Sequence, residues 1–424
     1  MDSPSACLTE AKYEEQCEFI SSPSDLDTDG KRVIANNISV MMKRPIIANT
    51  GVSQWFDVWN LVSDHNGASP AIVAFGHMKE VMGCAGIRNL PVVLKCYIND
   101  VHWEFEEDIL GMQYEGRVYA CIVANMTSSP FFAFPYAVFS KSPVLTDPFE
   151  RKLSKELQEI FSDESQRKGA KTRRYNPTCN YMIMEHCGTI TLEQTVKWCD
   201  ASTFIQLTLQ MLSALKTMQT NKITHNDMHW GNVLIKDGSP IFYMDIQSGE
   251  VMHGDADGHY CARIDAGNLV KIFDWDAAVA HRLDTNPKTS SFGAQTNTFK
   301  KSFDTIAFLR VWRKVILFYI GRRYGENRSS NDECRSIFKH CFEQLEAEYP
   351  WAFKSGKGRF WQTVCRPVQG KYGKNPNFED DCKDTWPEEM DLKFEKAISK
   401  FTLLIAQMLP ASNLRGEFYA PSIY

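Results

Sequence analysis

Short apolar runs separated by glycine-containing turns mark the first half of the chain. Residues 71–74 and 91–98 are aliphatic runs of strand length, and residues 131–139 form an aromatic run that also predicts a strand. A fourth run, 180–184, predicts a buried strand, whereas the pattern of 104–126 predicts a helix. This half of the chain is therefore expected to be rich in strands.

The second half has a more helical pattern. Apolar residues recur at helical spacing over 202–218, which predicts a strong amphipathic helix. A short apolar run predicts a strand over 270–273, and the chain beyond Phe303 is expected to be mostly helical.

Two segments differ from this pattern. Residues 1–65 are mixed and carry turn signals, so they are expected to form an extension packed on the main body. Residues 141–174 are crowded with charge around sparse apolar residues at helical spacing, which predicts an inserted surface helix. The insert ends in a basic tract, 167–174, with two open interpretations: a solvated loop or a docking site for an acidic partner.

The composition is that of an ordinary globular protein, with 424 residues, 43% hydrophobic and 23% charged. The formal net charge of −5 argues against a surface that binds nucleic acid or membrane as a whole. The 13 cysteines include no CxxC pair, so reduced thiols in the cytoplasm or nucleus are expected. No apolar run approaches the ~20 residues of a membrane span, and the polar, acidic N-terminus predicts neither a signal nor a transit peptide.

The densest chemistry lies in residues 225–232, which read H-x-D-x-x-x-x-N and lead into an apolar run. The Asp and Asn of this motif are Asp227 and Asn232, while Lys95 lies in a predicted strand and Asp274 follows another. These are the parts that a phosphoryl-transfer site needs, because lysine supplies positive charge to phosphates and a loop Asp orients or accepts a hydroxyl proton. The Asn and the later Asp offer hard oxygen ligands to Mg²⁺.

With these motifs the chain resembles the protein-kinase superfamily over roughly residues 69–309. The resemblance implies that Asp227 is the catalytic aspartate and that Lys95 matches the lysine of the V-A-I-K motif. It also implies that Asn232 and Asp274 bind Mg²⁺, with Asp274 at the place of the DFG aspartate.

The same resemblance implies an α+β fold with two lobes and a nucleotide between them. The N-lobe is expected to be β-rich and the C-lobe mainly helical. The expected boundaries are an N-terminal extension at 1–65, an N-lobe at 66–184 that carries the 141–174 insert, and a C-lobe at 185–424.

Lys95 is expected to pair with a helix glutamate. Glu115 is preferred because it lies 20 positions after Lys95, and Glu106 and Glu107 are its rivals. Residues 181–188 (YMIMEHCG) are similar to the strand and hinge that hold adenine through main-chain hydrogen bonds. This similarity implies a gatekeeper and hinge residues at three positions, namely Met184, Glu185 and Cys187.

Three more residues have expected structural roles. Asp304 resembles the buried aspartate that opens the central C-lobe helix and fixes the catalytic loop by accepting backbone N–H bonds. His225 is expected to bond backbone carbonyls rather than to carry a proton. For Asp276, a second Mg²⁺ contact and a loop cap are both open.

The catalytic loop departs from the common kinase pattern at two positions. Asn226 replaces the Arg that usually binds a phosphorylated activation loop, so activity without loop phosphorylation is expected. His229 replaces a Lys, and it is either a donor to a phosphate oxygen or a packed structural imidazole.

Three further departures lie outside that loop. The glycine-rich loop is thin, because an alignment that ends on Val81 keeps only Gly76, with Ala74 and Lys79 at the outer glycine positions. An insert separates Asn232 from Asp274, which lie 42 positions apart. No A-P-E motif follows Asp274, so the activation segment is expected to be short or rebuilt. Together these departures resemble haspin and the atypical serine/threonine kinases of large DNA viruses.

The expected function is therefore an ATP- and Mg²⁺-dependent serine/threonine protein kinase. A small-molecule kinase of the choline or aminoglycoside type shares the loop motif and remains an alternative, as does a pseudokinase scaffold. The expected partners are ATP and the hydroxyl of a protein substrate, with no membrane span and no direct nucleic-acid binding. The expected location is the cytoplasm or nucleus or, for a viral protein, the host cell or virion.

Overall fold

The computed structural model divides the chain into two compact units, each described here by itself. Unit 1 comprises Met1–Ala120 and Ala133–His186, and unit 2 comprises Cys121–Phe132 and Cys187–Tyr424. The structure describes the following residues: 28–42, 49–63, 72–79, 90–98, 114–120, 129–144, 146–151, 179–196, 199–237, 242–246, 248, 251–252, 260–264, 267–286, 299, 301–318, 336, 338–340, 342–345, 347, 388–409 and 414–415.

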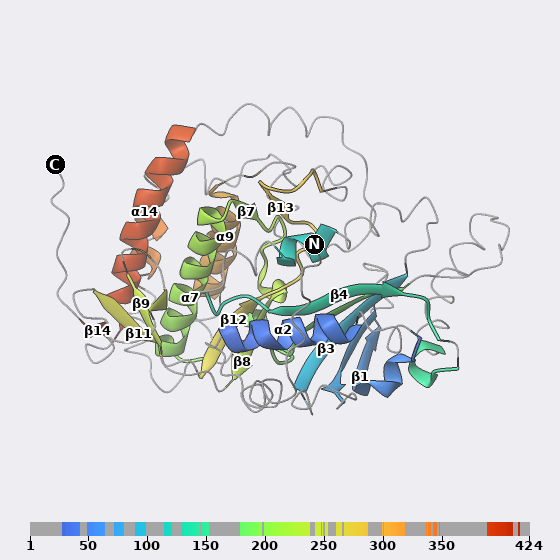
Figure 1. Ribbon diagram of the computed structural model, residues 1–424. Coiled ribbons are helices and arrows are strands. Elements are labelled where there is room, and N and C mark those ends of the chain that lie inside the picture. Colours follow the sequence, from blue (N-terminus) through green and yellow to red (C-terminus); the bar gives the residue numbers. More distant parts are fainter. Residues whose placement is uncertain are drawn as a thin grey trace, which may run out of the picture. The chain divides into compact units, whose positions relative to one another are not determined.

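Unit 1 is built on a five-stranded antiparallel sheet (Figure 1). Its strand order is β1-β2-β3-β5-β4. The strands are β1 (Phe56–Ser63), β2 (Ile72–Met78), β3 (Leu90–Ile98), β4 (Pro135–Lys141) and β5 (Cys179–Glu185). The strands expected at 71–74, 91–98 and 180–184 are therefore present, and the strand expected at 131–139 begins only at Pro135.

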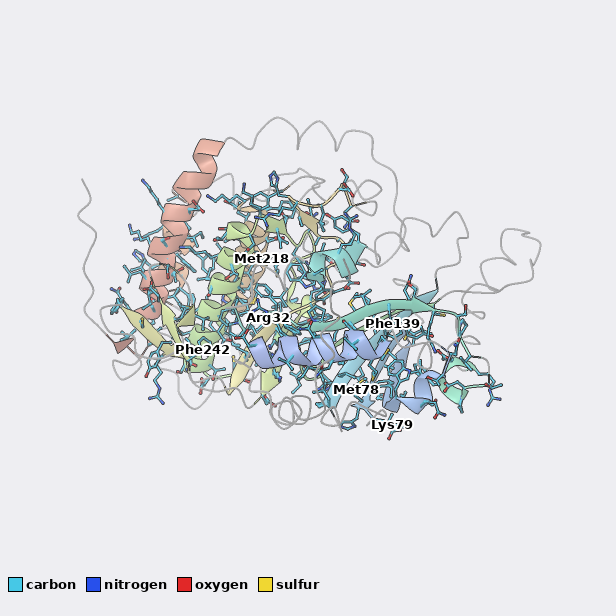
Figure 2. The ribbon with its side chains drawn as sticks, in the orientation of Figure 1. Arg32, Met78, Lys79, Phe139, Met218 and Phe242 are labelled. Carbon is cyan, nitrogen blue, oxygen red and sulfur yellow. The ribbon has the colours of Figure 1, made fainter. Side chains whose placement is uncertain are left out.

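Strand β5, which lies between β3 and β4, is buried at all seven positions, which explains its continuous apolar run. Aromatic side chains pack on one face of the sheet, where Tyr181 stacks on Phe139 with ring centroids 5.2 Å apart. Phe139 is labelled in Figure 2. Helix α2 (Thr28–Met42) packs along β4 (Figure 1). On the other face, residues 114–120 form a helix that brings Glu115 to Lys95. The rest of the helix expected over 104–126 lies outside the described residues.

The segment expected to be an extension contributes directly to this sheet. Strand β1 pairs with β2 from Phe56 to Ser63, after a short 3-10 helix, η1 (Val52–Gln54). A register shift between Val58 and Asn60 interrupts the pairing. The described residues of the 1–65 segment belong to unit 1, and the division at 186/187 lies two residues from the expected boundary at 184/185.

Unit 2 contains the long helix α7 (Ala201–Thr220), which begins at the N-cap Asp200. The helix expected at 202–218 is thus present. Trp312, on α9 (Phe303–Phe318), stacks on Phe204 of α7 at 4.7 Å and donates its indole N–H to Thr208 Oγ1 at 2.7 Å. A third long helix, α14 (Glu388–Ala406), also packs on α7 (Figure 1).

Small sheets in unit 2 frame the 225–232 loop. One sheet has the order β12-β8-β6, and a second pairs β13 with β7. Their bounds are β6 (Ile190–Thr191), β7 (Ile223–Thr224), β8 (Val233–Asp237), β12 (Asn268–Ile272) and β13 (Val279–Ala280). Two short helices, α6 (Leu192–Thr195) and η2 (Trp230–Asn232), lie beside them.

The insert between Asn232 and Asp274 forms most of a further antiparallel sheet. Its strand order is β10-β9-β11-β14. The strands are β9 (Phe242–Asp245), β10 (Val251–Met252), β11 (Cys261–Ile264) and β14 (Leu414–Arg415). Three of these strands come from the insert, and the fourth comes from 150 positions later in the chain.

The fold class is α+β with mostly antiparallel sheets, as expected. Within the described part of the chain, no helix is both long enough and apolar enough to cross a membrane.

Candidate functional site

A buried aspartate fixes the start of the 225–232 loop in unit 2. Asp304, in the first turn of α9, accepts the main-chain N–H of His225 at 2.6 Å and that of Asn226 at 3.0 Å. Burial raises the pKa of Asp304 to about 6, against the opposing effect of His225 and of the two N–H donors. The expected structural contact of Asp304 is therefore confirmed.

His225 connects this loop to the residue before Asp274. Its Nδ1 accepts the Asp227 N–H at 3.3 Å, so a neutral ring carries its proton on Nε2. Nε2 lies 2.9 Å from the carbonyl oxygen of Phe273, to which it donates. The ring is fully buried and lies 4.6 Å from the Trp275 ring. The expectation that His225 bonds a backbone carbonyl is confirmed.

Asn226, the next residue of the loop, has a left-handed backbone, with φ 65°. Asparagine tolerates this conformation better than most residues. Its amide Nδ2 donates to the carbonyl of Ala277 at 3.0 Å. A neutral hydrogen bond therefore joins the loop to the segment that follows Asp274.

Asp227 and Asn232 contact each other directly. The Nδ2 of Asn232 donates to both the main-chain oxygen and Oδ2 of Asp227, each at 3.0 Å. Because the amide nitrogen faces Asp227, the oxygen Oδ1 of Asn232, which lies in the same plane, is directed away from these two contacts. The Asp227 side chain is half-exposed, at 47%.

His229 lies beside Asp227 and caps η2. Its Nδ1 accepts the N–H of Gly231 at 3.0 Å, and its Nε2 lies 3.5 Å from Asp227 Oδ2. A Cβ on Gly231 would come within 2.8 Å of the His229 ring, so this contact requires glycine. The cap was not predicted, although a histidine followed two positions later by a glycine is the sequence feature that this contact uses.

The two side chains shift each other's pKa. Burial by itself raises the pKa of Asp227, but the hydrogen bond and charge of His229 outweigh it and the net pKa is lowered. Burial by itself lowers the pKa of His229, but Asp227 outweighs it and the net pKa is raised. Asp227 is thus held in its ionised form at neutral pH.

Asn232 and Asp274 lie at the same end of a strand pair. Strands β8 and β12 are antiparallel with Val233 opposite Ile272, and Phe273 N donates to Asn232 O at 3.2 Å. Asp274 follows with a left-handed backbone, φ 64°. The position of β12 is fixed by Gln210 of α7, whose amide accepts from Val270 N and donates to Asn268 O, each at 3.0 Å.

This arrangement provides a set of oxygen donors that suits Mg²⁺. Mg²⁺ usually takes one or two protein ligands and completes its shell with water and phosphate oxygens. An amide oxygen and a carboxylate at one strand-pair end fit that pattern. Among the residues that the structure describes, no group of three His, Cys, Asp or Glu side chains could hold a metal by itself. Asp276 uses its main-chain oxygen to accept from Asn286 at 2.8 Å, which leaves both interpretations of its carboxylate open.

In unit 1, Lys95 pairs with the preferred glutamate. Lys95 Nζ lies 2.9 Å from Glu115 Oε2, and the two side chains are 9% and 0% exposed. The rivals Glu106 and Glu107 lie outside the described residues. Met184 pairs with Val93 across the β3–β5 ladder and is buried, so it shares a face of the sheet with Lys95.

The two expected hinge residues are both buried. Glu185 ends β5 and donates its main-chain N–H to Phe134 O at 2.8 Å. Cys187 is 1% exposed and is the first residue of unit 2 after β5.

Gly76 is not in a turn, contrary to the glycine-loop expectation. It lies inside β2, paired with Val58 and Val92. A Cβ there would come within 2.3 Å of the Asp57 carbonyl oxygen and 2.4 Å of the Phe56 ring, so packing explains this glycine. Val81 lies outside the described residues, and the connection between β1 and β2 is 64–71.

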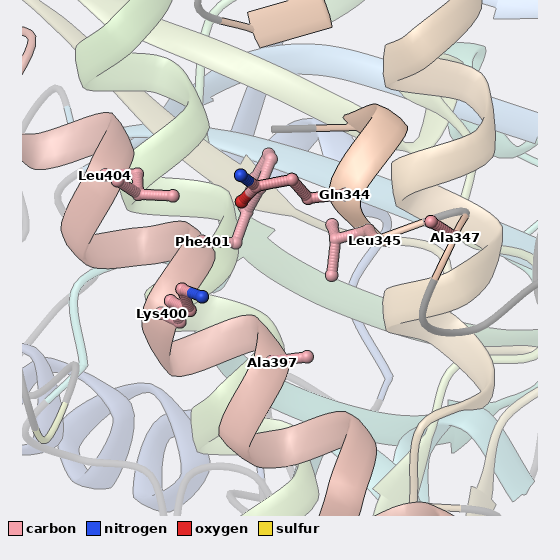
Figure 3. Close-up of a pocket in the computed structure, with 7 residues that line it drawn as sticks. All are labelled: Gln344, Leu345, Ala347, Ala397, Lys400, Phe401 and Leu404. Carbon is pink, nitrogen blue, oxygen red and sulfur yellow. The ribbon is translucent and has the colours of Figure 1, made fainter. Parts of the chain in front are cut away.

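A groove in unit 2 lies apart from all these residues. It has a volume of about 370 Å³ and lies between α14 and the helical residues around Leu345 (Figure 3). Its lining residues are Gln344, Leu345, Ala347, Ala397, Lys400, Phe401 and Leu404. None of the predicted site residues lines it.

Comparison with known proteins found no relative. No family model matches the chain, and no curated protein matches it either. The candidate site therefore depends on the geometry described above.

Proposed function

We propose that this protein is an ATP- and Mg²⁺-dependent phosphotransferase of the bilobal kinase type, acting on serine or threonine hydroxyls of a protein. The observation that carries the proposal is the network around Asp227. Asp304 and His225 hold the loop at its start, Asn232 contacts the carboxylate, and His225 also bonds the residue before Asp274. Phosphoryl transfer depends mostly on positioning and charge, which such a network provides.

Asp227 is the proposed acceptor of the hydroxyl proton. Its carboxylate is half-exposed and ionised, and the Asn232 amide restricts its orientation. A substrate hydroxyl that donates to this carboxylate would be directed for in-line attack on the γ-phosphorus of ATP. Its proton would pass to Asp227 as the new phosphate ester forms, the bond to the β–γ bridging oxygen breaks and ADP leaves.

Lys95 is the proposed donor to the inner phosphates of ATP. Glu115 keeps the ammonium in place at 2.9 Å inside a buried setting. Bound Mg²⁺ would neutralise phosphate charge, and Asn232 and Asp274 are the residues that would hold it. Met184, Glu185 and Cys187 are the proposed adenine contacts, while Gly76 is left out because packing accounts for it.

Two features favour a protein acceptor over a small molecule. These are the hinge-like residues after β5 and the Asp304 helix, both of which resemble protein kinases. The proposed enzyme does not require loop phosphorylation, because the neutral amide of Asn226 already binds the Ala277 carbonyl. His229 and Asp274 do not separate the two classes, because small-molecule kinases of the choline or aminoglycoside type share these positions.

Incubation with γ-labelled ATP and Mg²⁺ tests the proposal. Three acceptors are offered in parallel: a mixed protein substrate, choline and an aminoglycoside. Label on protein, including the chain itself, supports the proposal, and label only on a small molecule supports the alternative. ATP binding without any transfer would identify a scaffold, and no ATP binding at all contradicts the proposal.

A further inference from the structure

A buried ion pair joins helix α2 to the end of strand β5 in unit 1. Lys31 Nζ lies 2.9 Å from Glu185 Oε1, and the two side chains are 6% and 3% exposed. The residues are 154 positions apart. Lysine and glutamate are almost never buried unless they are paired, so this contact is a specific feature of the fold.

Glu185 is fixed at three of its atoms. Its Oε1 accepts from Lys31, and its Oε2 accepts the Phe134 N–H at 3.2 Å. Its main-chain N–H donates back to Phe134 O at 2.8 Å. The direction of the main chain at the end of β5 is therefore set jointly by Phe134 and, through the carboxylate, by α2.

We propose that Lys31 is a positioning residue for the nucleotide, because it holds Glu185 and thereby the main chain that receives the adenine. This inference rests on the proposed function and extends it to a segment, α2, that no motif explained. Lys31 acts through Glu185 and does not itself touch ATP.

The physical reason lies in the cost of an unpaired buried charge. Without Lys31, the Glu185 carboxylate must bind a proton or turn toward water. Either change weakens its bond to the Phe134 N–H and frees the end of β5 to move. Binding of the nucleotide suffers, whereas Asp227 and its partners are untouched.

Unit 1 supplies a matched control for this argument. Lys141 Nζ lies 2.7 Å from Glu150 Oε1, with side chains that are 5% and 0% exposed. Glu150 also accepts from Val144 N at 2.7 Å and from Tyr181 Oη at 2.9 Å. This second pair has the same residue types and similar burial. It lies at the C-terminal end of β4, whereas the Lys31–Glu185 pair lies at the C-terminal end of β5.

The experiment compares Lys31→Met with Lys141→Met in the full chain. Both variants should lose stability, which thermal unfolding measures. Only Lys31→Met should raise the Kd for ATP, by about tenfold, because the main chain at the end of β5 is no longer held in place. Its kcat at saturating ATP should stay within about twofold of wild type. Arg32→Ala, on the exposed side of α2 (Figure 2), is a surface control and should change neither the Tm nor the Kd for ATP.

A double variant keeps the test decisive if Lys31→Met folds poorly. Lys31→Met with Glu185→Gln removes both charges and keeps an oxygen acceptor for Phe134 N–H, so it should regain most of the ATP affinity. Equal Kd changes in the Lys31 and Lys141 variants at equal loss of Tm would overturn the inference. The absence of recovery in the double variant would do the same.

Failure of the proposed function gives a different result. If wild type binds no ATP, the kinase proposal fails before any variant is compared. If wild type binds ATP and Lys31→Met binds it equally well, only the inference fails. Amide hydrogen exchange of Glu185, faster in Lys31→Met but not in Lys141→Met, reports the loss of positioning without any nucleotide.

Discussion

The two units hold their candidate residues by different means. In unit 2, buried side chains bond the main chain of the loop, as when Asp304 accepts two N–H groups and His225 binds the Phe273 carbonyl. In unit 1, the main candidate pair is one ion pair, Lys95 with Glu115, buried between a strand and a helix.

This difference determines how each unit responds to mutation. A loop fixed by several main-chain bonds keeps its shape when one exposed functional side chain changes. A buried ion pair has no such reserve, because removal of one partner leaves an uncompensated charge. In unit 2, replacing an exposed functional side chain should therefore lower activity without lowering stability. In unit 1, replacing a member of the buried ion pair should lower both.

The largest expected effect on rate is that of Asp227→Asn. The variant keeps the size of the side chain and loses the proton acceptor, so kcat should fall by about 10²–10⁴-fold. Since Asp227 is half-exposed and the loop is held elsewhere, Tm should stay near that of wild type. Asp237→Asn, at the exposed end of β8, is the control. Near wild-type turnover in Asp227→Asn would show that the base assignment is wrong.

Lys95→Met should combine a loss of activity with a loss of stability. It leaves Glu115 buried without its partner, which costs about 3–5 kcal/mol of unfolding free energy. Adding Glu115→Leu should restore stability, because replacing a buried ion pair with apolar residues is often neutral. Activity should not return. Chemical denaturation and turnover measured on both variants test this link, and an active double variant would contradict the role of Lys95.

Asp304→Asn should destabilise unit 2 by about 1–3 kcal/mol, because an amide N–H would face one of two main-chain donors. Asp200→Asn is the matched control, since asparagine caps a helix as well as aspartate does. Equal Tm losses in the two variants would contradict the assigned contact.

Comparison of wild type with Asp304→Asn at several pH values gives a further test. The folded-state pKa of Asp304 is about 6, above its unfolded value of about 3.9, so the folded protein binds this proton more tightly. Its contribution to stability therefore decreases as pH rises from about 4 to about 6. The Tm advantage of wild type over Asp304→Asn should shrink across that range.

The smallest expected effect is that of His229→Asn. The Asn side chain keeps an acceptor for Gly231 N–H but removes the group that lowers the pKa of Asp227. The pKa of Asp227 should rise, so the acid limb of the rate profile should move to higher pH. His281→Asn, at an exposed position, is the control. A shift to lower pH would contradict the assigned direction.

Local motifs were sufficient to predict most of the unit 2 site. The H-x-D-x-x-x-x-N letters, the strand before Asp274 and the start of the α9 helix are each short-range signals. Their contacts follow because strands β8 and β12 pair with Asn232 and Asp274 at one end. Glu115 could be selected as the partner of Lys95 because helix and strand lie only 20 positions apart.

Other features had no local signal. The strand β1 was missed because the register shift at Val58/Asn60 breaks the alternation that marks a strand, and Gly76 was consequently assigned to a turn. The Lys31–Glu185 pair joins residues 154 positions apart, and no spacing rule connects them. The cap formed by His229 on η2 agrees with the structural interpretation of this histidine, but the sequence did not specify its partner, Gly231.

The sheet β10-β9-β11-β14 has a consequence for synthesis of the protein. Strand β11 is translated about 150 residues before β14, its neighbour in the sheet. At roughly 5–20 residues per second, the ribosome needs about 8–30 s to add β14. Throughout this interval that edge of β11 has no partner strand, so nascent chains are expected to need shielding there by chaperones until β14 has been made.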